Sequence, residues 1–324
     1  MTPPPSDHFN GKTFFSRRHI NRHWLDVLHW RLTSRGVRWP ARVEVASLPP
    51  PPAPRGREIV ATWIGHATWL VQTTRGNFLF DPVFSERASP VQWAGPQRVH
   101  PPGLAWQALP RIDVVFLSHD HYDHCDAPTL RRLAAEHAPL FVTPLRNGDL
   151  LAAAGARRVV ELDWWQAHSP AGGFEVTLTP TRHWSNRLGA PRNHRLWGGF
   201  FLTFGSAAPE TTVRRLWFAG DTGYDAELFG EIRRRCGAPD LALIPIGAYE
   251  PRWFMAPMHI NPAEAVAVHR DVGAKRSVAM HWGTFQLTDE AREAPVQALA
   301  TARSEAGIGA EEFAVLEPGE SLSI

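Results

Sequence analysis

Three histidines and two aspartates fall within residues 119–124, in the order H-D-H-Y-D-H. The apolar run directly before them predicts a short buried strand. Alternate residues of an extended turn point the same way, so His119 and His121 can converge on one cation. Asp123 and His124 lie further along the turn and can reach a second cation beside the first. The alternative, a solvated polar loop, gives no reason for these groups to gather behind a buried strand.

Three further polar residues come later in the chain, and each follows an apolar, strand-like run. They are His183, Asp221 in a glycine-flanked turn, and His281. Any one of them alone would more often be an ordinary structural residue. Together with the first cluster, they predict strand ends that meet at one edge of a sheet and complete a metal site. Imidazole and carboxylate ligands suit zinc, although iron and manganese accept the same groups, so the ligand types leave the metal open.

The elements that must position these residues follow from the hydrophobic pattern. Apolar runs at 59–64, 68–72 and 77–81, with a turn at 74–77, predict an antiparallel meander. The proline- and tryptophan-rich stretch 85–110 predicts a long irregular loop. Strand-like and helix-like runs then alternate, which suits two sheets packed face to face with helices outside. We expect helices at 129–135, 148–154, 227–236, 262–272 and 289–306, and strands at 140–144, 158–162, 174–180, 196–204, 213–219, 241–245, 277–280 and 313–316.

The composition is that of a globular protein that acts apart from nucleic acid. Of the 324 residues, 44% are hydrophobic and 20% are charged, which allows a sizeable core. The formal net charge is +2, so there is no strong positive field to attract nucleic acid. Only Cys125 and Cys236 occur, which excludes a disulfide framework and favours a reducing compartment. With no signal segment and no long apolar run visible, we expect a cytoplasmic protein.

Residues 1–55 are expected to form an extension ahead of the main domain at 56–324. A flexible start is predicted at 2–5, and the apolar spacing at 19–32 predicts one or two amphipathic helices. The prolines of 48–54 predict a stiff linker. The helical segment either docks on its own domain, which we favour, or faces a partner or a membrane. The second arrangement would allow a homodimer or peripheral membrane contact.

The H-x-H-x-D-H run resembles the signature of the metallo-β-lactamase fold superfamily. This resemblance implies an α+β protein, a four-layer αβ/βα sandwich, with two metal ions at one edge. It implies that one metal is held by His119, His121 and His183, the other by Asp123, His124 and His281, and that Asp221 bridges both. A bridging hydroxide would complete the site. Three further residues are expected around the ligands. Asp81 and Asp120 either accept from imidazole N–H groups or cap a turn, and His66 is either such a supporting group or a structural histidine.

A closer resemblance covers residues 58–290. The strings at 63–68, 80–85, 244–255, 259–266 and 279–285 are similar to the N-acyl-phosphatidylethanolamine-hydrolysing phospholipase D family. The resemblance implies that 56–324 is a hydrolase domain that cleaves a phosphodiester and releases phosphatidic acid from an N-acylated phospholipid. It implies a nucleophilic hydroxide held between the metals by groups that include Asp123 and Asp221.

His259 lies outside the implied ligand sets, and the family match places it near the site. We expect it to act as general acid or phosphate contact, with a solvent-exposed loop histidine as the alternative. The preceding apolar residues Tyr249, Trp253, Phe254 and Met255 would line an acyl groove, touch a bilayer or form a lid, and Arg252 would meet a phosphate.

Two other functions remain open at this stage. One is hydrolysis of another ester class on the same site, such as a lactone or a sugar phosphate. The other is a non-catalytic, regulatory metal protein. The complete set of seven implied ligands argues against the second, because a protein without catalysis would be expected to have lost some of them.

Overall fold

The computed structural model describes residues 6–18, 20, 24–46, 48, 51, 54–170, 172–205 and 213–324. The start predicted at 2–5 lies outside these residues, as do His19 and much of the proline-rich stretch 48–54. The helices are α1 (Trp24–Thr33), α2 (Ala127–Glu136), α3 (Gly148–Ala153), α4 (Ala226–Cys236), α5 (Arg252–Met255), α6 (Pro262–Val272) and α7 (Ala294–Ala306). The predicted irregular loop 85–110 contains one short 3-10 turn, Trp106–Ala108.

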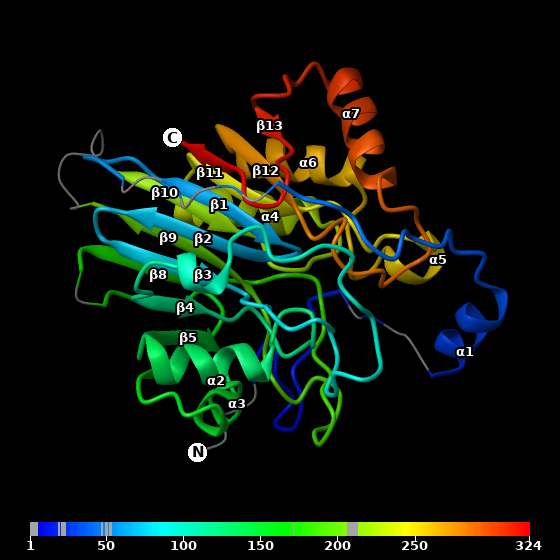
Figure 1. Ribbon diagram of the computed structural model, residues 1–324, viewed down its shortest axis with the longest axis horizontal. Coiled ribbons are helices and arrows are strands. Elements are labelled where there is room, and N and C mark those ends of the chain that lie inside the picture. The colour runs from blue at the N-terminus through cyan, green and yellow to red at the C-terminus, as the bar shows by residue number, and fades with distance from the viewer. Residues whose placement is uncertain are drawn as a thin grey trace.

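Two seven-stranded sheets form the body of the protein (Figure 1). The strands of the first sheet, in spatial order, are β14 (Ser321–Ser323), β1 (Val60–Gly65), β2 (Thr68–Thr73), β3 (Gly76–Phe80), β4 (Val114–Phe116), β5 (Leu140–Pro144) and β6 (Val159–Leu162). Those of the second are β13 (Phe313–Ala314), β12 (Arg276–Met280), β11 (Leu241–Pro245), β10 (Arg214–Phe218), β9 (Gly199–Phe204), β8 (Phe174–Thr179) and β7 (Ala167–His168). The predicted meander is the antiparallel set β1–β2–β3.

Each sheet is antiparallel at one side and parallel at the other. Strands β3 to β6 run parallel in the first sheet, and β10 to β13 run parallel in the second. The carboxyl ends of parallel neighbours lie at the same edge of a sheet. The residues that follow β3, β4, β10, β11 and β12 are therefore brought to one edge of the sandwich.

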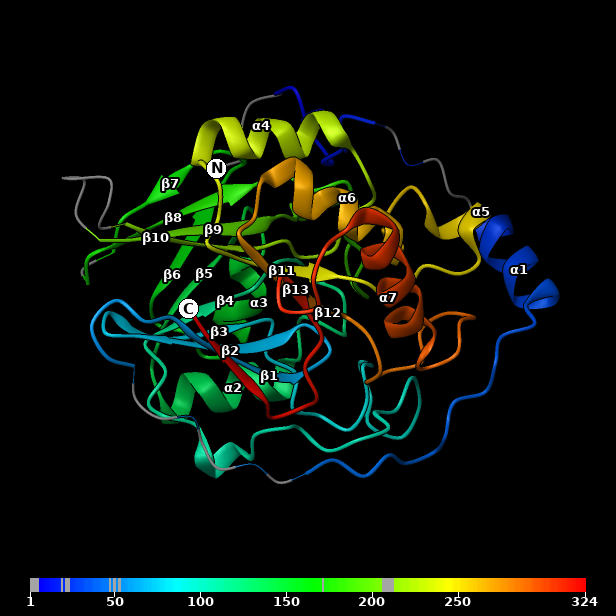
Figure 2. The ribbon, with the colours of Figure 1, turned by 90° about the horizontal axis from the view of Figure 1, so that it is seen from above.

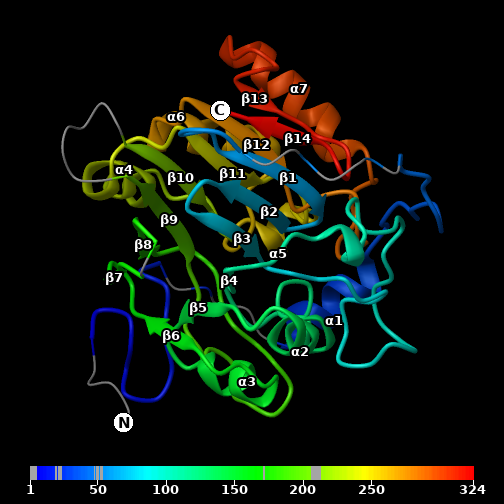
Figure 3. The same cartoon turned by 60° about the vertical axis from the view of Figure 1, so that its left-hand side comes forward.

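Helices cover the outer faces, which confirms the four-layer αβ/βα arrangement. Leu130 and Leu133 of α2 are buried against outward-facing residues of the first sheet, among them Leu79 and Val115. On the other side, α6 packs on β11 and contacts both α4 and α7 (Figure 2). Figure 3 shows α2 and α3 beside β4 to β6, well apart from α4 and α6.

Aromatic rings fill the space between the two sheets. The ring of Phe80 on β3 lies 4.8 Å from that of Phe116 on β4 and 4.9 Å from that of Phe218 on β10. Phe78 on β3 lies 4.9 Å from Phe174 on β8. Such stacked and edge-on pairs add specificity to the burial of large apolar surfaces. They join the sheets directly behind the edge where the polar residues collect.

The last long helix is shorter than predicted. A helix was expected at 289–306, but α7 begins at Ala294, with Pro295 in its first turn. The residues before it are held in a loop by their side chains. Asp289 accepts hydrogen bonds from Trp30 and Ser34, and Glu290 accepts hydrogen bonds from three backbone N–H groups of residues 248–250. By contrast, α6 starts as predicted, with Asn261 and Glu264 forming a capping box.

The N-terminal residues pack on the body of the protein. Phe9 and Phe14 are buried in the main core, and the Ser16 hydroxyl donates to the backbone oxygen of His183. Helix α1 contacts α5 through Trp30, whose ring stacks on Phe254 at 5.3 Å. The division of the chain at residue 55 remains a prediction from the sequence. In the described part of the chain, no helix combines the length and the apolar character needed to span a bilayer.

Candidate metal centre

The polar residues singled out in the sequence meet at one edge of the sandwich. From the first sheet come the residues that follow β1, β3 and β4, namely His66, Asp81 and the segment 119–124. From the second sheet come the residues that follow β8, β10, β11 and β12, namely His183, Asp221, His259 and His281. The site is therefore built from both sheets, and no single segment supplies it.

One group consists of His119, His121, His183 and Asp221, whose ligand atoms all lie within 4.8 Å of one another. Nδ1 of His121 lies 3.0 Å from Nε2 of His119 and 3.3 Å from Nε2 of His183. Nitrogen ligands about 2.05 Å from a tetrahedral zinc would be about 3.3 Å apart. The spacing of these three nitrogens fits a bound cation, and Nδ1 is the nitrogen of His121 that faces the other two rings.

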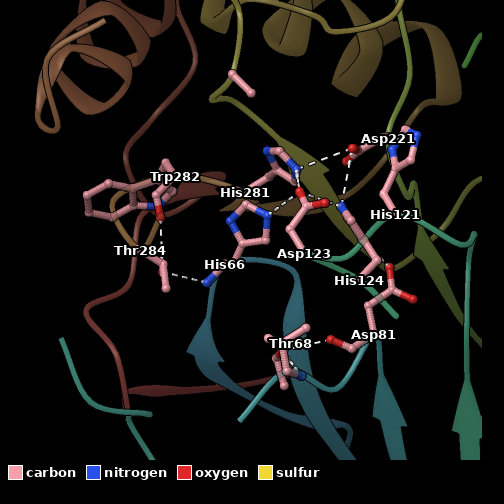
Figure 4. Close-up of polar contacts among 12 residues, drawn as sticks. His66, Thr68, Asp81, His121, Asp123, His124, Asp221, His281, Trp282 and Thr284 are labelled. Carbon is pink, nitrogen blue, oxygen red and sulfur yellow. Dashed lines mark hydrogen bonds and ion pairs between the residues drawn. The ribbon is translucent and has the colours of Figure 1, made fainter. Parts of the chain in front are cut away.

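A second group lies beside the first and includes Asp123, His124 and His281. Oδ2 of Asp123 lies 3.5 Å from Nε2 of His124 and 3.4 Å from Nε2 of His281 (Figure 4). His66 also belongs to this group, with its Nε2 atom 3.0 Å from the same carboxylate oxygen. The sequence left the role of His66 undecided, and the structure places it against a proposed ligand.

Asp221 lies between the two groups. Its Oδ2 atom is 3.2 Å from Nε2 of both His124 and His281, and 3.7 to 3.8 Å from Nε2 of His183 and His119. The side chain is 1% exposed. This position suits a carboxylate shared by two cations.

Several buried polar atoms here lack a hydrogen-bond partner among the described residues. They include Nε2 of His124, Nε2 of His281 and Oδ1 of Asp221, which all face the site. Unsatisfied polar groups in a buried site cost free energy, and most proteins avoid them. A pair of divalent cations would satisfy the donor set of nitrogen and carboxylate oxygen found here.

The ring of His124 is oriented by Asp81, one of the two aspartates expected either to accept from an imidazole or to cap a turn. Its Nδ1 atom donates to Oδ2 of Asp81 over 2.6 Å, which leaves Nε2 directed at the site. Ser118 donates to the same carboxylate from both its backbone N–H and its hydroxyl. On the other group, Nδ1 of His183 donates to the backbone oxygen of Met258 over 3.0 Å.

The expectation that Asp120 accepts from a site histidine is wrong. Its carboxylate accepts from the backbone N–H of Asn186 and from the guanidinium of Arg195. Arg187 donates to its backbone oxygen. Asp120 thus fastens the loop after His183 to the 119–124 segment. No local sequence signal links these positions, because residue 120 and residues 186–195 meet only in the folded chain.

Electrostatics divides the histidines into two classes. Burial lowers the pKa of His119 well below its usual range, that of His121 to about 4 and that of His183 to about 3. These rings are therefore neutral near pH 7, as metal ligands must be. For His281 burial acts in the same direction, but the Asp221 and Asp123 carboxylates outweigh it and raise the pKa to about 9.

His259 lies at the rim of the site. Its side chain is 13% exposed, and Nδ1 is 3.9 Å from Oδ2 of Asp221. The ring lies 5.1 Å from that of His183 and 5.6 Å from that of His281. The structure therefore brings His259 to the proposed ligands, as expected from the sequence.

The expected phosphate contact by Arg252 is not supported. Its guanidinium donates to both carboxylate oxygens of Glu264 and to the backbone oxygen of His259. Arg252 is instead engaged within the protein and fixes the backbone beside His259. Sequence reasoning also missed Glu290, whose carboxylate holds the backbone of residues 248–250. A lone glutamate in an apparent helix gave no signal for that role.

The fold and the site together define a metal-dependent hydrolase. A family model described as the beta-lactamase superfamily domain matches residues 76–282, and the chain belongs to this family. The chain is 30% identical over 270 residues to a UPF0173 metal-dependent hydrolase of Pyrobaculum aerophilum, with 81% of this chain and 98% of the relative covered.

A second relative is a phospholipase. The chain is 40% identical over 238 residues to the N-acyl-phosphatidylethanolamine-hydrolyzing phospholipase D 1 of Caenorhabditis elegans. The alignment covers 71% of this chain and 65% of the relative, slightly less than two thirds of its length. Among solved structures, an isothiocyanate hydrolase from Delia radicum gut bacteria has a TM-score of 0.61 at 20% identity, covering 81% of this chain and 98% of the other. At that identity the likeness shows the fold alone.

Proposed function

We propose that the protein is a binuclear phosphodiesterase of the phospholipase D type that acts on N-acyl-phosphatidylethanolamine-like lipids. The observation that carries the proposal is the position of Asp221 between two groups of ligands. Two bound divalent cations would supply Lewis-acid stabilisation of the phosphate charge and a nucleophile at neutral pH. His119, His121 and His183 would hold one cation, Asp123, His124 and His281 the other, and Asp221 both.

The residues of the chain would contribute position and charge. Asp221 is fixed from the second sheet and the 119–124 segment from the first, so the packed core between the sheets fixes how the two halves of the site meet. Burial of these groups keeps bulk water from competing with a phosphate. Zinc is the preferred metal, because the ligands are imidazole and carboxylate groups.

His259 is proposed to contact the phosphate. Burial lowers the pKa of His259 to about 3, so the ring is neutral near pH 7. A neutral imidazole still donates one hydrogen bond, which suits contact with a phosphate oxygen better than delivery of a proton to the leaving alkoxide. The test is His259→Ala beside His259→Gln, which keeps a donor. Unchanged turnover in the alanine variant, with full metal content, would remove His259 from the mechanism.

The choice of a lipid substrate is supported by the phospholipase D relative and by an apolar surface near the site. Leu25, Leu28 and Leu32 of α1 are 45–77% exposed, and Trp253 of α5 is 47% exposed. The two helices lie side by side, with His29 and Trp253 rings 5.3 Å apart (Figures 1 and 2). We propose that this surface makes peripheral contact with a membrane, since exposed apolar side chains on a helix favour the lipid interface.

The decisive experiment is a substrate panel with measured metal stoichiometry. Vesicles of N-acyl-phosphatidylethanolamine, phosphatidylethanolamine and phosphatidylcholine are compared with a chromogenic phosphodiester, a phosphomonoester and a lactone. We expect release of phosphatidic acid from the N-acylated lipid and cleavage of the chromogenic phosphodiester. Hydrolysis of the lactone or the monoester alone would overturn the proposal. Light scattering on the same sample tests the predicted homodimer.

A further inference from the structure

His66 is a buried histidine in the site that no ligand set of the proposed centre uses. It follows β1, and its side chain is 2% exposed. The ring lies 4.0 Å from that of His281 and 5.5 Å from that of His124. Its Nε2 atom is 3.0 Å from Oδ2 of Asp123 (Figure 4). Two roles are open to it, as a further metal ligand or as a residue that holds Asp123.

The distances favour the second role: Nε2 of His66 lies at hydrogen-bond distance from Oδ2 of Asp123, 3.0 Å, whereas Nε2 of His124 and of His281 lie 3.5 and 3.4 Å from the same oxygen. A carboxylate oxygen can only accept, so a hydrogen bond in this contact requires the proton on Nε2 of His66. A ring nitrogen that carries a proton has no lone pair for a metal. We infer that His66 is a positioning residue, which donates a hydrogen bond to Asp123 and sets the direction of that carboxylate.

The backbone of His66 joins the same site. Its carbonyl oxygen accepts from the backbone N–H of His281 over 2.9 Å, and its own N–H donates to the hydroxyl of Thr284 over 2.7 Å. His66 follows a strand of the first sheet, whereas His281 and Thr284 follow β12 of the second. His66 therefore ties the two sheets together beside the second metal group, through its side chain on one ligand and its backbone on another.

The backbone conformation indicates that this tie is built into the fold. His66 has a φ of 53° and His281 a φ of 61°, both in the left-handed region. Such conformations are unfavourable for residues with a Cβ and persist where the surrounding contacts enforce them. Here the contacts are the hydrogen bonds between these two residues and their neighbours.

His66 and Asp81 each hold one of two neighbouring ligands of the proposed centre. Asp123 and His124 are consecutive in the chain, and each is held from behind by a group of the other kind. An imidazole holds the carboxylate, and a carboxylate holds the imidazole. Groups that orient metal ligands in this way change metal affinity by about 10- to 100-fold when removed.

The experiment compares wild type with His66→Ala and His66→Gln. Glutamine can place an N–H donor near the position of Nε2 but is a poor zinc ligand. His269→Gln is the control, since His269 is buried on α6 and bonds Ser277 away from the site. Folding is monitored by thermal unfolding, and the affinities for the first and second equivalents of zinc by chelator competition.

We expect His66→Ala to weaken the binding of one of the two equivalents of zinc by about 10- to 100-fold and to leave the other nearly unchanged. His66→Gln should recover most of that loss. Equal losses in the two variants would overturn the inference, because a ligand role predicts that glutamine cannot substitute. Wild-type affinities in His66→Ala would overturn it as well.

A second measurement detects the proton on Nε2 of His66 by NMR. In protein loaded with ¹¹³Cd and labelled with ¹⁵N-histidine, the His66 signals are identified by their loss in His66→Gln. A retained Nε2–H supports the inference, and coupling between ¹¹³Cd and a His66 nitrogen overturns it. The inference rests on the proposed two-metal centre but not on the substrate. If the wild-type protein binds two cations but does not cleave N-acyl-phosphatidylethanolamine, the proposed function is refuted. The zinc affinities of the His66 variants then still test the inference about His66.

Discussion

Nδ1 of His124 and Oδ2 of Asp81 are 2.6 Å apart, and neither side chain has any exposed surface. The carboxylate also accepts two hydrogen bonds from Ser118, the residue just before the proposed ligand segment 119–124. Asp81 follows β3 and the segment follows β4, its parallel neighbour. A ligand and the residue that orients it are thus set by the pairing of two adjacent strands.

Replacement of Asp81 with asparagine should disturb the orientation of His124. Asparagine has the same shape, but it carries no charge and has one acceptor oxygen in place of two. We expect the affinity for the cation proposed to bind His124 to fall by about 10- to 100-fold. Activity should fall to a matching extent when the metal concentration is limiting. Chelator competition measures the affinity.

The control for this variant is Asp113→Asn. Asp113 directly precedes β4 and accepts from the backbone N–H of Asn77, so it lies at the opposite end of the strands from Asp81. If both variants bind metal as wild type does, Asp81 has no role in positioning His124.

Removal of metal should lower the stability of the whole fold. The proposed ligands come from both sheets, so cations that bind only the folded protein stabilise it. At a free metal concentration 100 times the dissociation constant, the gain is about 2.7 kcal/mol. We expect a chelator to lower the melting temperature and zinc to restore it. His259→Ala should respond in the same way, since His259 is not a proposed ligand. A melting temperature that does not change on addition of the chelator would contradict a metal site built from both sheets.

The N-terminal segment should confer a pH-dependent contribution to stability. The ring of His8 lies between carboxylates, with Nδ1 2.6 Å from Asp7 and Nε2 2.7 Å from Asp163. Burial opposes the charged ring, but the hydrogen bonds to the two carboxylates prevail and raise its pKa above 6.5. The hydrogen bond from His8 in turn lowers the pKa of Asp7 below 3.8.

The sign of the effect follows from these directions. A raised histidine pKa contributes stability that is complete below about pH 6.5 and is lost as the pH rises through the raised value. A lowered aspartate pKa contributes stability that is present above about pH 4 and is lost on acidification. The difference in unfolding free energy between wild type and His8→Gln should therefore be largest near pH 5 to 6 and shrink by pH 9. Urea unfolding at each pH measures it, and a difference that grows towards pH 9 would contradict the assignment.

Arg252 should affect turnover without affecting metal content. Its guanidinium holds Glu264 and the backbone oxygen of His259. In Arg252→Met the loop can shift, and a displacement of about 1 Å in a positioning group costs up to about 100-fold in rate. We expect a loss in kcat with two cations still bound. Loss of metal in this variant would show that the loop supports the ligands instead.

The sequence was sufficient to predict the sandwich and to single out seven residues that meet at its edge, because they follow apolar strands. It was not sufficient for the contacts behind them. Asp120 and Asp81 looked alike beside the ligands, yet only Asp81 meets a site histidine, because β3 and β4 pair in parallel. Arg252 looked like an anion contact until its pairing with Glu264 was known. Such roles depend on which segments meet in space, and local pattern does not encode that.

The aromatic rings that join the sheets have a consequence for the proposed metal centre. The segment 119–124 follows a strand of one sheet, and His183, Asp221 and His281 follow strands of the other, with Phe80 and Phe218 in contact between them. Each proposed ligand group draws on both sheets, so sliding of one sheet across the other would move its members apart. A cavity made in the phenylalanine packing, far from the ligands, should therefore weaken metal binding as well as the fold.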